Sequence, residues 1–405
     1  MSAIEINTPL VKEIKTMNYQ KLDKEFVANT YGRFDVCFVK GEGSVVYDEK
    51  GKEYIDLGSG IGVTAFGIHD DVWANAVINQ VKSLNHVSNL YYTLPQMELA
   101  QKLCEKTGMK KVFFSNSGAE ANECAIKTAR KYSSDKYGGD RNVIITLVNS
   151  FHGRTITTLS ATGQDVFHQH FGPFTEGFIF TPANDLDAFY EVAKNPRVCA
   201  VLIETIQGEG GVMPLEADFV QGIANYAADN DILLLVDEVQ TGNGRTGKMY
   251  GYENFDIHPD VVSTAKGLAA GLPMGATLFN EKTQFVLDAG AHGSTFGGNP
   301  ICAAGAITVV DRLTDEFLAD VAKKGQYVKD QLEGATGVIS VSGLGLMLGI
   351  ECTAEPKSII AKCLEQGVVV LSAKNKVRLL PALNIPQEQL EKAIGILKQV
   401  IADLA

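Results

Sequence analysis

Three ionisable residues follow apolar stretches of the chain, where their side chains could act together. Glu204 and Asp237 each come directly after a run of apolar residues, and Lys266 lies shortly beyond Val261 and Val262. Short apolar runs of this kind are consistent with buried strands. Ligands of open α/β sheets bind outside the carboxyl ends of the strands, so these three side chains are candidates for one site.

Asp237 and Lys266 together indicate a specific chemistry, although each has an ordinary explanation when taken alone. The carboxylate could cap a helix or bind a metal ion, and a lone lysine is usually a solvated surface charge. Burial disfavours a charged acid, so Asp237 needs a cationic partner. Small residues surround Lys266, and a desolvated lysine is a nucleophile toward aldehydes. Pyridoxal 5′-phosphate (PLP), an aldehyde with a protonated ring nitrogen, would use both groups.

A candidate phosphate site lies where a predicted strand gives way to a predicted helix. Ser117, Gly118 and Ala119 are small residues at this helix start, where backbone N–H groups and the helix dipole attract an anion. The alternative is a simple capping box from Ser117 to Glu120. A second small-residue segment at 293–299 could add hydroxyl contacts.

Two arginines could bind the carboxylates of a substrate. Arg154 follows a predicted strand and lies close to Phe151, whose ring could stack on a pyridine. Arg378 has apolar neighbours, and a buried guanidinium demands a carboxylate, which a substrate or Glu209 could supply. For each arginine the alternative is a structural ion pair.

Residues 242–247 match the dinucleotide pattern GxGxxG and nearly match a P-loop. Both motifs require a helix to begin at the glycines, and Met249 stands where a P-loop has Ser or Thr. Residues 249–255 are a poor helix start, so we expect no nucleotide site here.

The composition excludes several classes of protein. The chain has 405 residues and a net charge of −12, which argues against nonspecific binding to nucleic acid or acidic membranes. Seven dispersed cysteines without a CxxC pair predict reduced thiols, with neither a disulfide framework nor a metal site. The first residues show no signal-peptide pattern, and no apolar run is long enough for a membrane span, so we expect a cytoplasmic protein.

Strand and helix patterns alternate through the middle of the chain. Continuous apolar runs separated by amphipathic helices predict an α/β fold, with a mostly parallel sheet covered on both faces. Residues 34–57 alternate apolar and polar positions and predict a small antiparallel meander. The predicted organisation is an N-terminal segment that belongs to a small α+β lobe, a large domain and a C-terminal small domain, at 1–58, 59–310 and 311–405.

Several motifs together resemble a known family over nearly the whole chain. They are Asn29–Phe34, Ser88–Tyr92, Glu204–Gly211, Asp237–Gln240 with Ser263–Gly267, and Arg378. The chain is similar to class III aminotransferases of PLP fold type I, above all to those that act on acetylornithine. The resemblance implies a seven-stranded sheet in the large domain and a homodimer with shared active sites.

The resemblance also implies roles for individual residues around the cofactor. Lys266 would hold PLP as an internal aldimine, and Asp237 would bind the ring nitrogen. The remaining cofactor contacts would be Ser117, Gly118 and Ala119 at the phosphate, Phe151 and Val239 on the two faces of the ring, Gln240 at the phenolic oxygen, and Thr295 from the neighbouring subunit.

On the substrate side, the resemblance implies two carboxylate sites and a switch. Arg154 would anchor the α-carboxylate of the amino donor, with Ser294 nearby. Arg378 would bind 2-oxoglutarate, and Glu209 would neutralise Arg378 while the donor is bound. The implied reaction transfers the ω-amino group of N2-acetylornithine to 2-oxoglutarate, a step of arginine biosynthesis.

Three alternatives remain at this point. The donor could be ornithine, 4-aminobutyrate or succinylornithine, because Arg154, Glu209 and Arg378 would serve these donors too. The protein could instead bind a nucleotide through residues 242–247. It could also be a PLP-shaped scaffold that only binds a partner, which the presence of Lys266 and Asp237 argues against.

Overall fold

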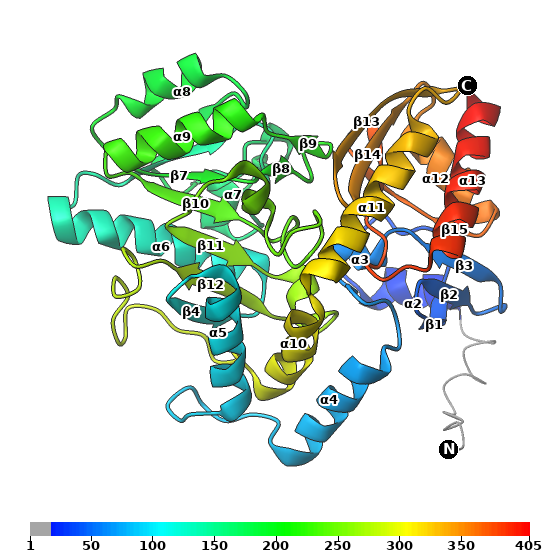
Figure 1. Cartoon of the computed structure of the whole chain (residues 1–405), viewed down its shortest axis with the longest axis horizontal. Coiled ribbons are helices and arrows are strands. Elements are labelled where there is room, and N and C mark those ends of the chain that lie inside the picture. The colour runs from blue at the N-terminus through cyan, green and yellow to red at the C-terminus, as the bar shows by residue number, and fades with distance from the viewer. Residues whose placement is uncertain (1–17) are drawn as a thin grey trace.

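A seven-stranded sheet forms the centre of the larger lobe in the computed structural model, which describes residues 18–405 (Figure 1). Its strands span Lys111–Ser115 (β4), Val143–Leu147 (β5), Phe178–Thr181 (β6), Val198–Ile203 (β7), Leu233–Asp237 (β10), Val261–Thr264 (β11) and Gly275–Phe279 (β12). Their order is β4-β12-β11-β10-β7-β5-β6. Neighbouring strands from β11 to β6 run parallel, whereas β12 is antiparallel to both β11 and β4. The predicted mostly parallel, seven-stranded sheet is confirmed.

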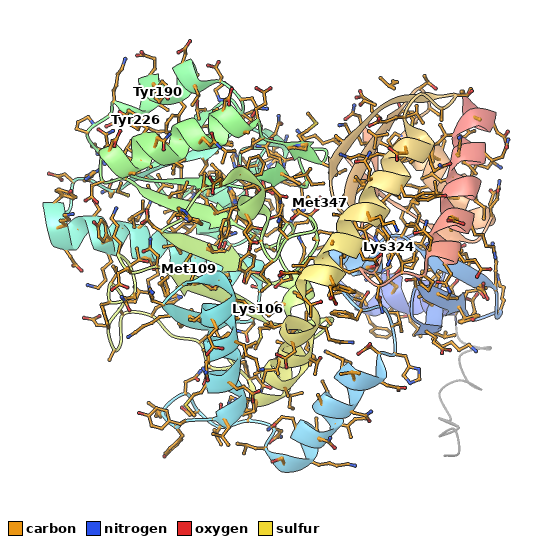
Figure 2. All side chains as sticks on the ribbon, in the orientation of Figure 1. Lys106, Met109, Tyr190, Tyr226, Lys324 and Met347 are labelled. Atoms are coloured by element: carbon orange, nitrogen blue, oxygen red, sulfur yellow. The ribbon has the colours of Figure 1, made fainter. Side chains whose placement is uncertain are left out.

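Helices cover both faces of this sheet, which explains the continuous apolar runs of its strands. On β10, Leu233 and Leu235 pack in a cluster with α6 (Gly118–Tyr137), whereas Leu234 and Val236 pack in the cluster that contains α9 (Ala217–Asp229). Beside α9 lies α8 (Leu186–Ala193). Tyr190 of α8 and Tyr226 of α9 lie with their ring centroids 5.4 Å apart (Figure 2).

The smaller lobe contains a second sheet and three long helices (Figure 1). The sheet has the order β13-β14-β17-β16, with Val338–Leu344 (β13), Met347–Cys352 (β14), Leu371–Ala373 (β16) and Lys376–Leu379 (β17). The helices are Asp315–Leu332 (α11), Pro356–Glu365 (α12) and Gln387–Leu404 (α13).

The N-terminal part of the described chain joins the smaller lobe through a shared sheet. Phe38–Glu42 (β1), Val45–Asp48 (β2) and Glu53–Asp56 (β3) form the predicted antiparallel meander, and Val368–Val369 (β15) pairs with β3 in parallel. This pairing agrees with a lobe built from both ends of the chain, while the domain boundaries themselves stay predictions. The other α-helices and strands of the described chain are Tyr19–Phe26 (α2), Ser59–Gly62 (α3), Asp71–Ser83 (α4), Leu94–Thr107 (α5), Ile156–Ala161 (α7), Pro300–Arg312 (α10), Ile206–Gln207 (β8) and Met213–Pro214 (β9).

An apolar cluster joins the two lobes. Ile206 and Val212 of the larger lobe pack with Met347, Ala373 and Leu380 of the smaller lobe. Met347 lies where the lobes meet (Figure 2). The relative position of the lobes is therefore fixed by buried side chains as well as by the connecting chain.

All seven cysteines lie in the described part of the chain and are unpaired, and four of them are buried. They fill apolar space, as the sequence predicts. Within residues 18–405, no helix combines the length and the apolar character that a membrane crossing requires.

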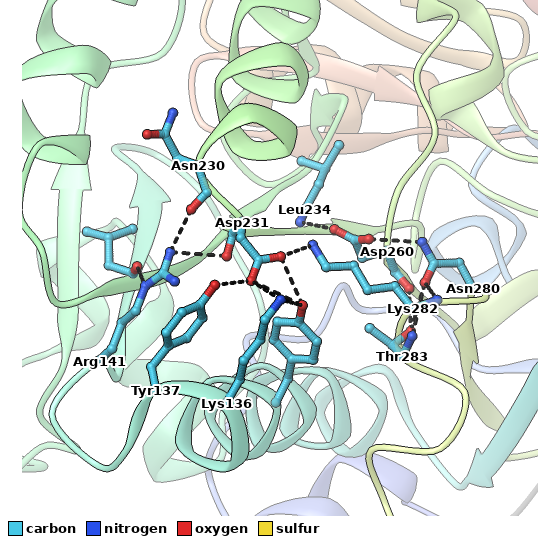
Figure 3. A network of polar contacts seen from close by, with 12 residues as sticks. Lys136, Tyr137, Arg141, Asn230, Asp231, Leu234, Asp260, Asn280, Lys282 and Thr283 are labelled. Atoms are coloured by element: carbon cyan, nitrogen blue, oxygen red, sulfur yellow. Dashed lines mark hydrogen bonds and ion pairs between the residues drawn. The ribbon is translucent and has the colours of Figure 1, made fainter.

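Asp231 ties the far end of α6 to the sheet through a network of polar contacts (Figure 3). Its carboxylate lies 2.8 Å from the ammonium groups of both Lys136 and Lys282, and accepts hydrogen bonds from the phenols of Tyr132 and Tyr137. Burial opposes the charge, but these donors outweigh it and hold the pKa of Asp231 well below its usual value. The network therefore stabilises the folded state only while Asp231 is ionised.

We expect the substitution Asp231→Asn to lower the free energy of unfolding by about 1–2 kcal/mol at pH 7. The pKa of Asp231 is lower in the folded protein than in the unfolded chain, where it is about 3.9. The stabilisation is therefore fully present above that pH and is lost as the pH falls below it. Urea unfolding at pH 7 and at pH 3 measures the effect. A stability difference that does not shrink in acid would contradict this account.

Candidate active site

A cavity of about 480 Å³ lies at the carboxyl ends of β10 and β11, beside the first turn of α6. This is the edge at which the sequence predicts a site. The predicted residues that line it are Ser117, Gly118, Ala119, Phe151, Arg154, Glu204, Asp237, Val239, Gln240 and Lys266. Four predicted residues do not line it, namely Glu209, Ser294, Thr295 and Arg378.

Asp237 is the last residue of β10, and three groups hold its buried carboxylate. Asn122 donates to Oδ2 at 2.7 Å, and Nδ1 of His152 lies 2.9 Å from the same oxygen. The backbone N–H of Val239 donates to Oδ1 at 3.0 Å. None of these groups is a lysine or an arginine, so this carboxylate is oriented toward the cavity and available to a cationic ligand.

Lys266 follows β11 by two residues and lines the same cavity. Its φ of 46° lies in the left-handed region, a conformation that is strained for a side chain of this size and is found at functional sites. Burial lowers the pKa of its amine, although Glu209 and Asp237 oppose this effect. The amine has no hydrogen-bond partner within residues 18–405, so it is available to react.

Glu204, directly after β7, completes the three ionisable residues that the sequence singles out. Its carboxyl accepts hydrogen bonds from the backbone N–H groups of Phe151 at 3.0 Å and Gly208 at 3.3 Å. Burial and the nearby charge of Asp237 raise the pKa of Glu204 well above its usual value. Through these two bonds Glu204 supports the loops around the cavity.

The sequence leaves two alternatives open for the first turn of α6, a capping box and an anion site, and the structure is compatible with both at once. Ser117 accepts from the backbone N–H of Glu120 at 3.2 Å, and the carboxylate of Glu120 accepts from the backbone N–H of Asn116 at 2.6 Å. This capping leaves the N–H groups of Gly118 and Ala119 without an acceptor inside the helix. Those two groups can bind an anion in the cavity.

Gly118 also shows how closely the cavity walls approach each other. A Cβ atom at this position would lie 2.7 Å from Cγ1 of Val239, so only glycine lets the helix start pack against that side chain. The walls thus offer free N–H groups, an aromatic ring at Phe151, the buried carboxylate of Asp237 and the half-buried Lys266. This set of groups fits a phosphorylated, cationic aromatic aldehyde.

Arg378, which is buried, contacts the half-buried side chains of Glu209 and Gln240 at the edge of the cavity. Arg378 on β17 donates to Glu209 at 2.5 Å and to Oε1 of Gln240 at 3.2 Å, and Gln240 also donates to Glu209 at 3.3 Å. Burial alone would raise the pKa of Glu209, but the charge and hydrogen bond of Arg378 outweigh it and lower that pKa. The structure therefore brings together the arginine and the glutamate that the sequence predicts as partners.

Arg154 lies against two aromatic rings. Its guanidinium carbon is 4.4 Å from the ring centroid of Phe167 and 5.7 Å from that of Phe151. Within the described part of the chain it has no carboxylate partner, so the structural ion pair considered from the sequence is not formed there. The exposed guanidinium remains free to bind a carboxylate in the cavity.

Ser294 and Thr295 lie outside the cavity of their own chain. Ser294 accepts from Asn116 at 3.1 Å, next to the first turn of α6, whereas Thr295 is exposed. Their predicted contacts with substrate and cofactor stay predictions.

Comparison with known proteins decides the family. Residues 26–401 match the family model for class III aminotransferases. The chain belongs to this family. The acetylornithine aminotransferase of Haemophilus ducreyi is 50% identical over 387 residues, with 95% of this chain and 98% of that protein covered. The acetylornithine aminotransferase of Aquifex aeolicus is 44% identical, with coverage of 93% and 100%.

Solved structures of other aminotransferases share the whole fold. One is the ornithine aminotransferase of Toxoplasma gondii crystallised with oxidised glutathione, with PLP at partial occupancy in its active site. It has a TM-score of 0.92 and 29% identity, and 98% of each chain is covered. The N-acetylornithine aminotransferase of Stenotrophomonas maltophilia has a TM-score of 0.82 and 33% identity, with 95% and 98% covered. The class III aminotransferase described here therefore has PLP fold type I.

Sequence reasoning missed two residues of the site. It assigned no role to Asn122 or His152, the two side chains that hold Asp237. Asn122 is a fully buried amide on the mostly apolar buried face of α6, which also contains Thr128 and Ser133, and Ser263 donates to its carbonyl oxygen at 2.5 Å. A polar residue on the buried face of α6 is the one signal that could have identified it.

Proposed function

We propose that this class III aminotransferase transfers the ω-amino group of N2-acetylornithine to 2-oxoglutarate, with PLP attached to Lys266. The products are N-acetylglutamate 5-semialdehyde and glutamate. The observation that carries the proposal is the meeting of a half-buried lysine, a buried carboxylate and a free helix N-terminus in one cavity. Relatives named acetylornithine aminotransferase, up to 50% identical over nearly the whole chain, support the choice of donor.

The cofactor would be held by groups at three sides of the cavity. Gly118 and Ala119 would bind its phosphate through their N–H groups, together with Ser117. Phe151 and Val239 would flank the ring, and Gln240 would contact its phenolic oxygen. When bound, PLP supplies an electron-withdrawing ring that stabilises negative charge on the substrate carbon beside the amine.

Lys266 has two tasks in this proposal. Its lowered pKa makes the neutral, nucleophilic amine accessible, so that it can attach the cofactor covalently. Once a substrate amine has displaced Lys266 from the cofactor, the freed amine of Lys266 can accept a proton from the substrate carbon and donate it elsewhere. Asp237 would keep the ring nitrogen protonated through the charge that Asn122 and His152 orient.

Glu209 and Arg378 would let one pocket accept two unlike substrates. While the donor is bound, Glu209 neutralises Arg378, as in the ion pair described above. When 2-oxoglutarate enters, its distal carboxylate would replace Glu209 as the partner of Arg378. Arg154, which has no carboxylate partner in the described chain, would bind the α-carboxylate of the donor, with Ser294 nearby.

We expect Arg378→Gln to raise the KM for 2-oxoglutarate by about 100-fold, because a charge-assisted pair with the substrate is lost. The rate of the donor half-reaction should change by less than about threefold. Glu209→Gln is the matched variant and should do the opposite: it leaves Arg378 uncompensated while the donor is bound and slows that half-reaction. Equal effects of both substitutions on both half-reactions would contradict the exchange of partners.

Amino-donor profiling tests the proposed donor. The purified holoenzyme is given 2-oxoglutarate with N2-acetylornithine, ornithine, 4-aminobutyrate or succinylornithine, and the glutamate formed is measured as kcat/KM for each. We expect N2-acetylornithine to rank first. A higher value for any of the other three donors replaces the proposed substrate and leaves the reaction type intact.

We also propose that the enzyme is a cytoplasmic homodimer in which Thr295 reaches the partner's cofactor. Asn89 donates to the backbone oxygens of Ser294 and Gly297, which places the segment after Asn89 beside Thr295. That segment exposes large side chains, with Leu90 at 87% and Tyr92 at 92% exposure, as expected of a surface that a second subunit covers. Sedimentation equilibrium tests the dimer, and a monomer at micromolar concentration would exclude it.

A further inference from the structure

Residues 241–250, which we term the glycine loop, contain the GxGxxG motif without the helix that a nucleotide site of this kind requires. No helix begins at these glycines: the segment consists of turns and leads to a short 3-10 helix at Gly251–Phe255. The glycines instead permit close packing within the protein. A Cβ atom on Gly244 would lie 2.8 Å from Leu313, and one on Gly247 would lie 2.8 Å from Ala322 of α11. The glycine loop is therefore wedged against the helices that lead into the smaller lobe.

Arg245, in the middle of the glycine loop, reaches across to the smaller lobe. Its Nη1 donates to the backbone oxygens of Leu346 at 3.1 Å and Pro381 at 2.5 Å, and its own carbonyl accepts from the N–H of Leu346 at 3.0 Å. The side chain is 2% exposed, and no carboxylate within residues 18–405 pairs with it. Burial alone lowers the pKa of Arg245 to about 9.

A buried guanidinium without an acid is costly, so stability does not explain its presence. Its two acceptors lie at one end of the strand pair that carries Arg378. Gly349 of β14 lies opposite Arg378 of β17, Leu346 directly precedes β14, and Pro381 follows Arg378 by three residues. Arg245 therefore holds both strands that position the Arg378 side chain.

The same loop also holds the segment that carries Lys266. Asn243 donates to the hydroxyl of Thr264 at 2.9 Å and to the carbonyl oxygen of Ala265 at 3.1 Å, directly before Lys266. Asn243 itself has a φ of 56°, so the loop holds a strained backbone to make this contact.

Glu238 closes the base of the glycine loop. Its buried carboxyl, adjacent to Asp237 in the chain, accepts from the hydroxyl of Thr241 at 2.5 Å and from the N–H groups of Gly251 at 2.8 Å and Tyr252 at 2.8 Å. Both ends of the loop are thus tied to one side chain, which makes the loop a stiff connection.

We propose that Arg245 and Asn243 are positioning residues, and that the glycine loop sets the distance between Lys266 and Arg378. The inference rests on the proposed function, in which Arg378 binds 2-oxoglutarate. Without the Arg245 contacts, β14 and β17 can shift relative to the cavity. Arg378 would then bind the carboxylate of 2-oxoglutarate at the wrong distance from Lys266.

The test compares the two half-reactions in the purified holoenzyme of Arg245→Gln. Loss of the visible cofactor band with N2-acetylornithine follows the first half, and its return with 2-oxoglutarate follows the second. We expect the concentration of 2-oxoglutarate at half-maximal rate to rise at least tenfold, while the donor half-reaction changes less than threefold. Arg245→Lys keeps the charge and enough donors for both carbonyls, but its side chain is shorter than that of arginine, so we expect a smaller split in the same direction. Arg245→Lys carries the test if Arg245→Gln does not fold.

Arg141 offers a matched control (Figure 3). It too donates only to backbone oxygens, those of Val198 at 2.7 Å, Asn230 at 2.9 Å and Asp231 at 3.0 Å, far along the sheet from the cavity. Arg141→Gln should lower the midpoint of thermal unfolding without altering either half-reaction.

The outcomes separate the two ideas. If Arg378→Gln impairs 2-oxoglutarate use and the Arg245 variants behave like Arg141→Gln, the positioning role is wrong and the proposed function stands. If Arg378→Gln itself leaves 2-oxoglutarate use unchanged, the proposed function fails first. Asn243→Ala adds a second readout: we expect it to slow both half-reactions by a similar factor, because Lys266 acts in each. An effect on the acceptor half alone would contradict its assignment to the Lys266 segment.

Discussion

The substitution Lys266→Ala is expected to lower the turnover number by about 10⁴-fold or more. It removes the covalent attachment of the cofactor and the group that moves the proton, and proton transfer alone contributes about 10²–10⁴-fold. Lys266→Arg should be almost as inactive, because a guanidinium stays protonated and is not a nucleophile. The steady-state rate with N2-acetylornithine and 2-oxoglutarate measures the loss.

Two further measurements connect that loss with the reacting amine. Borohydride reduction of the wild-type holoenzyme should add the mass of the cofactor to the peptide that contains Lys266, and to no peptide of the alanine variant. Lys282→Met is the control: Lys282 is a half-buried lysine with the carboxylate partner Asp231, far along the sheet. That change should reduce stability and leave turnover unchanged. Activity of Lys266→Ala within tenfold of the wild type would refute the assignment.

Asp237→Asn should reduce turnover by about 10³-fold while the protein stays folded. The amide has nearly the shape of the carboxylate, but it keeps only one acceptor oxygen, so it can retain the bond from Val239 or those from Asn122 and His152, and not both sets. What is lost is the negative charge that keeps a ring nitrogen protonated, and preorganised charge of this kind typically contributes about 10²–10³-fold per group. Asp237→Glu should retain more activity than the amide.

A cofactor analogue distinguishes the charge from a merely structural role. Reconstitution of Asp237→Ala with PLP methylated at the ring nitrogen, which carries a permanent positive charge, should restore part of the lost rate. His152→Asn should be milder than Asp237→Asn, at about 10–100-fold, because Asp237 keeps its charge and two of its three donors. Failure of the methylated cofactor to raise the rate above that of PLP would argue against the counter-charge.

Much of the site could be predicted because its key residues follow local patterns. The apolar runs before Glu204 and Asp237 specify strands β7 and β10, and parallel strands bring their carboxyl ends to one edge of the sheet. The same reasoning placed Lys266 beyond β11. The residues after the glycines of 242–247 are a poor helix start, and no α-helix forms there, only the short 3-10 helix at Gly251–Phe255.

Other features could not be predicted, because they depend on residues far apart in the chain. Strand β12 inserts antiparallel between β4 and β11, although its five residues alone do not show where they pair. Asn122 and His152 meet Asp237 across 115 and 85 positions, respectively. Contacts between residues this far apart in the sequence produce no periodic pattern, because each partner looks like an isolated polar residue.

By itself, then, the sequence determined the alternation of strands and helices in the middle of the chain, the edge of the sheet at which the cavity lies, and the presence of both an amine and a carboxylate there. Local periodicity and residue type encode these features directly. The tertiary structure decided that Arg378 pairs with Glu209, one of the two partners that the sequence left open, and it alone shows that Arg245 crosses to the smaller lobe. Such contacts form because the packing of the two lobes removes the polar groups of both lobes from water at the same time. No local pattern in the sequence indicates this packing.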